Sequence, residues 1–167
     1  MIIDSHCHLT YEPMLNTLNE TIDRANKEGI KYMLTISTQD KSFEQILKIV
    51  NDFESVYGTY GIHPHEAKSH QHIKSVDIIN KVNQNTKIIG VGETGLDFYY
   101  NHSEKKDQIN SFEEHISAAQ EKNLPLIVHT RSAEKETLQI LEKHSKKKRP
   151  ESLYIVLPEQ KNLLLNY

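Results

Sequence analysis

The order of strand-like and helix-like segments predicts an α/β protein with a parallel sheet of the (β/α) TIM-barrel type. Short apolar runs alternate with longer amphipathic ones along most of the chain. The short runs are too apolar to keep one face in water, which indicates a parallel sheet covered by helices. Side chains of the types that bind metals, histidine and glutamate, follow four of these runs. A barrel brings many strand ends to one centre, whereas an open sheet spreads them out.

The predicted elements follow one another in regular order. The strands cover residues near 2–6, 32–37, 56–62, 88–92 and 125–128, and a sixth fits 153–157. The helices cover residues near 13–28, 41–53, 73–82, 104–122 and 133–144. Gly29 suits the C-terminal cap of the first helix and Ser103 the start of the fourth. The apolar face of the third helix is expected to carry Ile73, Val76, Ile79 and Val82.

The predicted barrel is incomplete. A full barrel needs eight units and ~250 residues, and about five units are recognisable here. The sequence has 167 residues. We therefore expect residues 1–145 to form the N-terminal part of a barrel domain. Residues 146–167, which include the basic run 146–149, are expected to be a divergent tail of the kind that truncation or a frameshift produces.

Composition narrows the class of protein. Apolar residues make up 37% of the chain and charged residues 26%, which is typical of a soluble globular domain. The net charge of -3 argues against a broad basic surface for duplex binding. A lone cysteine, Cys7, favours a reducing compartment, and neither a signal peptide nor a membrane span is recognisable. The expected location is the cytoplasm, without membrane association.

The first candidate motif is Asp4-Ser5-His6-Cys7-His8, directly after the first strand. His6 and His8 are two residues apart, so both imidazoles can project to the same side of an extended chain. Neutral imidazole is a common ligand of divalent transition metals. Asp4 can accept a hydrogen bond from a ligand ring, and alternation turns Cys7 away as a small buried residue.

The second motif, Gly92-Glu93-Thr94-Gly95-Leu96-Asp97, follows the fourth strand. Glycine lets the backbone turn sharply and approach its neighbours, so Glu93 can reach a cation or a pair of cations. The alternative is a glycine-rich turn in which Glu93 caps the next segment. The sequence leaves open whether Asp97 orients a ligand histidine or caps a turn.

Two further motifs close strands three and five. His129 ends the fifth strand, and Arg131, two residues later, points to the same side, where a guanidinium can grip a phosphate. Pro64 separates His63 from His65, and these two histidines are candidates for contacting substrate oxygens or moving protons. The adjacent tyrosines 99 and 100 either flank the mouth of the site or pack. The other histidines are expected to be solvated: His70, His72, His102, His115 and His144.

Taken together, these motifs resemble the TatD-like DNase family over residues 1 to about 145. The resemblance lies in their order and spacing: His6-Cys7-His8, Gly61-Ile62-His63-Pro64-His65, Gly92-Glu93-Thr94-Gly95-Leu96-Asp97 and His129-Thr130-Arg131. It implies a TIM-barrel hydrolase that uses divalent cations to cut DNA, often from an end. It also implies that His6 and His8 ligate one metal, that Glu93 bridges two, and that His129 ligates the second.

The chain also departs from the family pattern. The family places a further histidine after strand six and an aspartate after strand eight, and neither has a counterpart here. Three hypotheses follow. The first is a deoxyribonuclease with two divalent cations (Mg, Mn or Zn), acting on DNA or another phosphodiester. The second is an amidohydrolase acting on a small substrate, although many of those carry a modified lysine where Glu93 stands. The third is an inactive fragment, with a separate chain completing the barrel.

Overall fold

The computed structural model describes residues 1–145 and the strand 154–158, and it contains a single parallel sheet. Six strands lie in the order of the sequence, β1-β2-β3-β4-β5-β6, and every neighbouring pair is parallel. Their bounds are β1 Ile2–Cys7, β2 Ile30–Thr35, β3 Val56–Tyr60, β4 Ile88–Asp97, β5 Leu126–Arg131 and β6 Tyr154–Pro158. The sequential order confirms the predicted incomplete barrel, because an open doubly wound sheet would reverse its strand order at a switch point.

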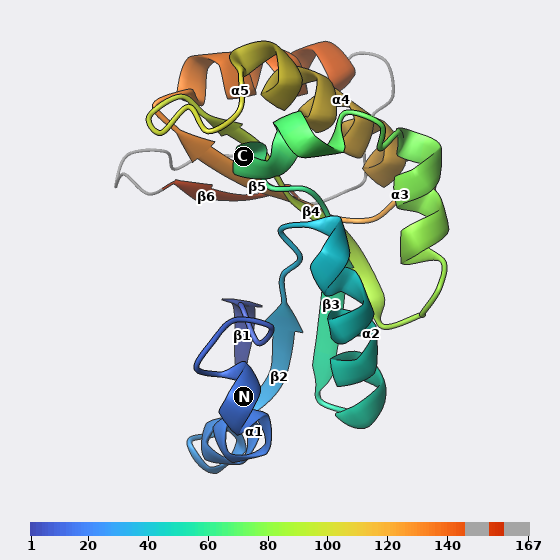
Figure 1. The fold of residues 1–167 in the computed structure, drawn as a ribbon. Helices are drawn as coiled ribbons and strands as arrows, with labels where there is room; N and C mark the ends of the chain where they lie inside the picture. Colours follow the sequence, from blue (N-terminus) through green and yellow to red (C-terminus); the bar gives the residue numbers. More distant parts are fainter. Residues whose placement is uncertain (146–153, 159–167) are drawn as a thin grey trace.

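Helices connect the strands and line the outer side of the curved sheet (Figure 1). They are α1 Leu18–Lys27, α2 Phe43–Asp52, α3 Ser75–Val82, α4 Lys105–Lys122 and α5 Glu134–Ser145. Three 3-10 helices are also present: η1 Leu15–Thr17 before α1, η2 Asp40–Ser42 before α2, and η3 Pro64–His70 in the loop after β3. No helix in the described part of the chain is long and apolar enough to cross a membrane.

The core lies between the sheet and these helices. Apolar side chains alternate along the strands, so Met33 and Val56 are buried against the helices. On the opposite, concave face, Ile3 and Tyr32 remain 53% and 44% exposed. The protein therefore has one dry layer under its helices and a second, partly apolar face that the described residues do not cover.

Two local predictions were wrong. Val76 is 58% exposed, whereas Ile78, absent from the predicted face of α3, is fully buried. Steps of three residues rotate by 300° and drift around the helix, so the true face follows the four-residue step from Ile78 to Val82. Ser103 does not cap α4 either: Glu104 occupies the cap position without a side-chain bond, and the Ser103 hydroxyl contacts the loop after β3 instead.

Strand β4 is longer than predicted. It continues through Glu93 to Asp97, and its last residues pair with β5, where Gly95 lies opposite His129. The strand expected near 153–157 is present as β6, paired with β5. The basic run 146–149 lies outside the described residues.

Candidate metal centre

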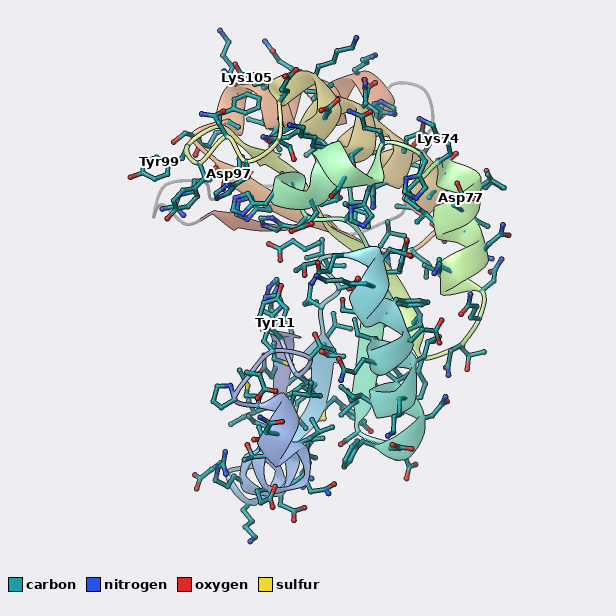
Figure 2. All side chains as sticks on the ribbon, viewed as in Figure 1. Tyr11, Lys74, Asp77, Asp97, Tyr99 and Lys105 are labelled. Atoms are coloured by element: carbon teal, nitrogen blue, oxygen red, sulfur yellow. The ribbon has the colours of Figure 1, made fainter. Side chains whose placement is uncertain are left out.

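The C-terminal edge of the sheet gathers the predicted ligands around one cavity. This cavity has a volume of about 590 Å³, and its lining includes His6, His8, Glu93 and His129. His6 lies near the end of β1, His8 just beyond it, Glu93 in β4 and His129 in β5. Figure 2 shows Tyr11, beside the β1 edge, and Asp97, from β4, on opposite sides of the opening that this cavity occupies.

The first group of possible ligands consists of His6, His8 and Glu93. Each offers a donor atom, and the three atoms lie within 4.8 Å of one another. The Nε2 atoms of the two histidines are 3.2 Å apart, and His6 Nε2 is 3.6 Å from Glu93 Oε2. The buried Nδ1 atoms of both rings have no hydrogen-bond partner. Two imidazoles and a carboxylate at this spacing are a donor set that suits a divalent cation.

The second group consists of His63, Glu93 and His129, whose donor atoms also lie within 4.8 Å of one another. His129 Nδ1 is 3.3 Å from Glu93 Oε1, the other oxygen of the same carboxylate. The sequence pattern had predicted a substrate contact for His63, and the structure places its ring 4.5 Å from that of His129. The Glu93 carboxylate thus stands between two clusters of imidazoles.

The tautomer of His63 favours the predicted substrate contact over a ligand role. Its Nδ1 accepts a hydrogen bond from the His65 backbone N–H at 3.2 Å. A neutral ring that accepts at Nδ1 carries its proton on Nε2, so Nε2 is a donor. Burial, followed by the neighbouring His129, lowers the pKa of His63 to about 3, which keeps the ring neutral. The remaining N–H can serve an oxygen of a substrate.

Local backbone geometry explains how Glu93 reaches the cavity. The β4 register shifts between Val91 and Thr94, so Glu93 sits at an irregularity of the strand. Gly92 and Gly95 on either side have φ values of +132° and +134°. A Cβ atom on Gly92 would lie 2.5 Å from the Ile127 carbonyl oxygen, and one on Gly95 would collide with that of His129. Only glycine allows β4 to lie this close to β5 in that conformation.

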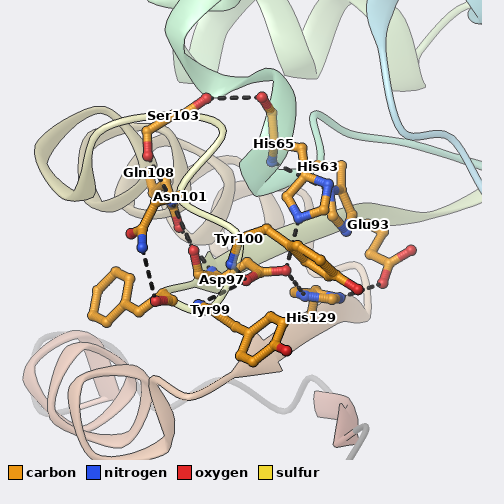
Figure 3. A network of polar contacts seen from close by, with 11 residues as sticks. His63, His65, Glu93, Asp97, Tyr99, Tyr100, Asn101, Ser103, Gln108 and His129 are labelled. Atoms are coloured by element: carbon orange, nitrogen blue, oxygen red, sulfur yellow. Dashed lines mark hydrogen bonds and ion pairs between the residues drawn. The ribbon is translucent and has the colours of Figure 1, made fainter.

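Asp97 fulfils both of the roles that the sequence left open (Figure 3). Its Oδ2 accepts from His65 Nε2 at 2.7 Å and lies 3.3 Å from His129 Nε2. Its Oδ1 accepts the backbone N–H groups of Tyr99 and Tyr100, both at 3.0 Å, and so caps the turn after β4. A carboxylate on Nε2 leaves Nδ1 of His129 directed at Glu93, the arrangement found where a second carboxylate orients a ligand histidine.

The groups around the centre keep its two carboxylates, Glu93 and Asp97, in their charged form. Burial works to raise the pKa of Glu93, but a hydrogen bond from His129 and the nearby His63 and His6 lower it overall. Burial also acts to raise the pKa of Asp97, but hydrogen bonds from the Tyr100 backbone and from His65 lower this pKa to about 2. Burial acts to lower the pKa of His129, yet Glu93 and Asp97 raise it overall. Both carboxylates therefore remain charged, which suits Glu93 to bind a cation and Asp97 to hold His65 and His129.

Asp4 does not orient a ligand ring, which corrects that prediction. Its Oδ1 accepts the backbone N–H of His6 at 3.1 Å, since a short side chain in an extended strand reaches the main chain two residues on more easily than the ring. Cys7 points away from the cavity as predicted, and its thiol donates to the Leu34 carbonyl oxygen at 3.4 Å. Burial raises the pKa of that thiol to about 12.

Arg131 lies in the lining of the cavity, as the phosphate-binding prediction requires. Its guanidinium carbon is 4.6 Å from the Tyr99 ring centre and 4.5 Å from that of Tyr100. Tyr100 lines the cavity, whereas Tyr99 is not in its lining, and both rings hold the arginine by cation–π contact. His65 lies in the same lining, held by Asp97.

Two histidines predicted to be solvated are buried. His115 is 1% exposed, where its Nε2 accepts the Ile62 backbone N–H at 3.0 Å and its Nδ1 lies 2.7 Å from the Ser111 carbonyl oxygen. His144 is 8% exposed, and its Nε2 lies 3.6 Å from Glu113. Both residues have polar neighbours along their helices, so the sequence pattern did not indicate that they are buried. The two-sided bonding of His115 joins α4 to the loop that carries His63.

The role of Gln108 was not predicted, and Ser103 was expected only to cap α4; both residues are buried. Gln108 bonds both backbone groups of Asp97, and Ser103 bonds the His65 carbonyl oxygen. A polar residue at every third or fourth place of α4 would have been the only signal, and it resembles an ordinary solvated face.

Comparison with known proteins agrees with the geometry. Residues 3–154 match the family of TatD related DNases. An uncharacterized metal-dependent hydrolase of Buchnera aphidicola subsp. Baizongia pistaciae is 33% identical over 149 residues, which cover 87% of this chain and 56% of that protein. The protein named 3'-5' ssDNA/RNA exonuclease TatD of Salmonella typhimurium is 28% identical over 141 residues, covering 84% of this chain and 54% of the relative.

A solved structure shows the same fold. The crystal structure of YJJV, a TatD homologue from Escherichia coli K12, superposes with a TM-score of 0.73 at 23% identity, covering 86% of this chain and 56% of that one. The chain thus spans little more than half the length of the relatives it matches. The family match covers nine tenths of the present sequence, with His6, His8, His63, Glu93 and His129 inside it, and this chain belongs to the family of TatD related DNases.

Proposed function

We propose that this chain carries the metal-binding part of a phosphodiester hydrolase that acts on DNA with two divalent cations. One observation carries the proposal: the two oxygens of Glu93 face different histidines, His6 at 3.6 Å and His129 at 3.3 Å. A carboxylate in that position can bridge two ions. When bound, such cations neutralise phosphoryl charge and lower the pKa of water toward neutrality, the chemistry that phosphodiester hydrolysis needs.

The side chains around the two groups match a phosphate. Arg131 offers a planar guanidinium, the geometry that pairs with phosphate oxygens. His63 offers a neutral Nε2–H in the same cavity, and His65 lies beside it, 4.4 Å between ring centres. In the proposed reaction, Arg131 and His63 would hold the non-bridging oxygens while water attacks the phosphorus. The bond from phosphorus to the leaving sugar oxygen breaks, the attacking water loses a proton, and the leaving oxygen gains one. His65, whose Nε2 bonds Asp97, would help to keep His63 in place. Metal ions rather than a basic protein surface would supply most of the positive charge, in keeping with a net charge of -3.

The substrate assignment to DNA rests on the family and on the name of one relative, an exonuclease of single-stranded DNA and RNA. The second candidate is an amidohydrolase acting on a small substrate, which the same scaffold can support. Glu93, in place of a modified lysine on β4, favours the first. The half-buried Cys7 thiol, outside any disulfide, supports a reducing location such as the cytoplasm.

We further propose that additional β-α units, from this protein or from a separate chain, cover the concave face of the sheet. Ile3 and Ile89 are 53% and 38% exposed on this face, and Ile2, in the edge strand β1, is 55% exposed. In the described residues, β1 pairs only with β2, so one row of its backbone groups faces outward. Closed barrels fill this face with layers of side chains and leave no open edge.

The test is cleavage of an end-labelled single-stranded oligonucleotide by the purified chain with Mg²⁺, Mn²⁺ or Zn²⁺. We expect shortened products that disappear with a chelator and in Glu93→Gln, but persist in Glu66→Gln, which changes another carboxylate in the lining of the cavity. A panel of small esters and amides runs in parallel. Cleavage of that panel alone favours the amidohydrolase. Metal binding without any hydrolysis would contradict activity of this chain alone and favour the inactive fragment.

A further inference from the structure

Strand β4 extends beyond the end of its pairing with β3 before it reaches Asp97. Its pairing with β3 ends where Tyr60 lies opposite Val91, whereas its pairing with β5 continues to Asp97 opposite Arg131. The next backbone N–H, that of Phe98, donates to the Arg131 carbonyl oxygen on the β5 side. Successive residues of a strand direct their backbone groups to opposite sides, so the N–H and C=O of Asp97 face the side where no strand follows.

Gln108 occupies the place of the missing strand. Its Oε1 accepts the Asp97 N–H at 2.8 Å, and its Nε2 donates to the Asp97 carbonyl oxygen at 3.0 Å. The second Nε2 proton goes to the Ser103 carbonyl oxygen at 2.9 Å. Gln108 and Asp97 are 0% exposed. Every donor of this carboxamide is therefore used, in a site that excludes water.

Ser103 extends the same network to the other side of the cavity. Its hydroxyl donates to the His65 carbonyl oxygen at 2.8 Å and accepts the Lys68 N–H at 3.0 Å. Gln108 is thus linked directly to the Asp97 backbone and, through Ser103, to the His65 backbone. The side chains of His65 and Asp97 also contact each other, through Nε2 and Oδ2 (Figure 3). The loop around His65 and the end of β4 are held as one unit.

We propose that Gln108 is a positioning residue for the half of the metal centre that contains His129. Its carboxamide holds the backbone of Asp97, and Ser103 carries the same constraint to His65. The Asp97 carboxylate then meets His129 Nε2 in one arrangement, which leaves His129 Nδ1 directed at Glu93. The hydrogen bonds of the Gln108 side chain go to the backbones of Asp97 and Ser103, so it acts on the candidate ligands through Asp97. This inference concerns ion binding, so it can stand or fall independently of the bond that the protein hydrolyses.

The test compares Gln108→Met with Gln120→Met. Gln120 lies on the same helix, and its amide donates to the His144 carbonyl oxygen in α5, away from both groups of candidate ligands. NMR follows a Zn²⁺ titration through the imidazole signals of His6 and His129 separately. We expect Gln108→Met to weaken binding at His129 by about 10–100-fold, the usual loss when an outer partner of a ligand is disturbed. Binding at His6 should change by a smaller factor than binding at His129, because Gln108 supports only the His129 half and the two groups are coupled only through the Glu93 carboxylate.

A second readout does not need the metal. In the ion-free protein, the Nε2 protons of His65 and His129 should give hydrogen-bonded signals that are protected from exchange. These signals should persist in Gln120→Met and disappear or broaden in Gln108→Met. Persistent signals with unchanged Zn²⁺ affinity at His129 would overturn the proposal. So would an equal loss at His6 and His129, because that would indicate general destabilisation.

Two other variants keep the test decisive if Gln108→Met does not fold. Gln108→Glu preserves the shape but removes both donors, and Ser103→Ala removes only the hydroxyl that bonds His65. We expect Gln108→Glu to reproduce the selective loss at His129. Ser103→Ala should change the His65 Nε2 signal and leave His6 unaffected. Wild-type behaviour of both variants would overturn the proposal.

Discussion

The two halves of the metal centre share Glu93 but are built differently. On the β5 side, His129 has a carboxylate at each ring nitrogen: Glu93 at Nδ1 and Asp97 at Nε2. On the β1 side, the Nδ1 atoms of His6 and His8 have no partner, and Asp4 is occupied by a backbone N–H. The His6 side chain is 20% exposed and that of His129 is 8% exposed.

The difference follows from the positions of the strands. Strand β5 has neighbours on both sides and lies against α4, so buried groups such as Gln108 and Asp97 can support its histidine. Strand β1 is at the edge of the sheet in the described residues, with β2 as its one neighbour. A ligand inside the sheet thus comes with its own supporting bonds, whereas a ligand at the edge depends on what covers that edge. Ion binding should therefore respond unequally to changes on the two sides.

The largest effect should come from the carboxylate that both halves share. Glu93→Gln keeps the size of the side chain and removes its charge. We expect divalent-ion affinity to fall by at least ~100-fold at each group, because losing a ligand costs more than losing an outer partner. Calorimetric titration with Mn²⁺ or Zn²⁺ measures it, with Glu66→Gln as the control. Loss at only one group would show that Glu93 does not serve both.

The next effect concerns His115, which joins α4 to the loop after β3. Burial lowers the pKa of His115 to about 4, so the folded protein holds this ring neutral while the unfolded chain protonates it below pH 6.5. Stability should therefore fall as the pH drops from 6.5 toward 4, by up to about 3 kcal/mol, and level off below.

Denaturation at several pH values would measure this, with His115→Gln as the comparison. Glutamine is neutral throughout, so the variant should lack this part of the pH dependence. Equal pH dependence of the two proteins would show that His115 does not contribute it.

The asymmetry itself is tested by a pair of matched changes, Asp97→Asn and Asp4→Asn. Asp97 bonds a ligand ring, so we expect about 10–100-fold weaker ion binding at His129 in its variant. Asp4 bonds only the backbone of His6, and its variant should change binding by less than about 3-fold. The same NMR titration reports both. An equal loss in the two variants would remove the distinction between the halves.

The smallest effect is expected at Cys7. Its thiol donates to the Leu34 carbonyl oxygen, so the sulfur is directed away from the cavity and from the candidate ligands. Cys7→Ser should therefore leave Zn²⁺ affinity within about 2-fold of wild type. A larger loss, seen by the same titration, would place the thiol among the ligands.

Strand ends were the part of the site that the sequence predicted well. His6, Glu93 and His129 follow apolar runs, and parallel strands bring their carboxyl ends to one edge, so the convergence followed from the fold alone. The extension of β4 to Asp97 was missed, because glycines at 92 and 95 resemble a turn. Their positive φ values serve close packing against β5 instead.

The supporting bonds could not be predicted. Gln108 and His115 are polar residues on a helix whose neighbours are polar too, so only the tertiary structure shows that they are buried. Asp97 was recognised as chemically important, but its two oxygens perform two functions at once. Nothing in the order of residues distinguishes one function from the other.

A shared carboxylate would also link the two proposed ion sites thermodynamically. The first ion to bind would fix the Glu93 side chain and spare the second ion the entropy of ordering it, while the two like charges would repel each other. The balance of these terms sets a coupling free energy, and by reciprocity each ion changes the affinity of the other by the same factor. Any change that tightens the His129 half is therefore felt at His6, although no side chain other than Glu93 belongs to both groups of ligands in the described residues.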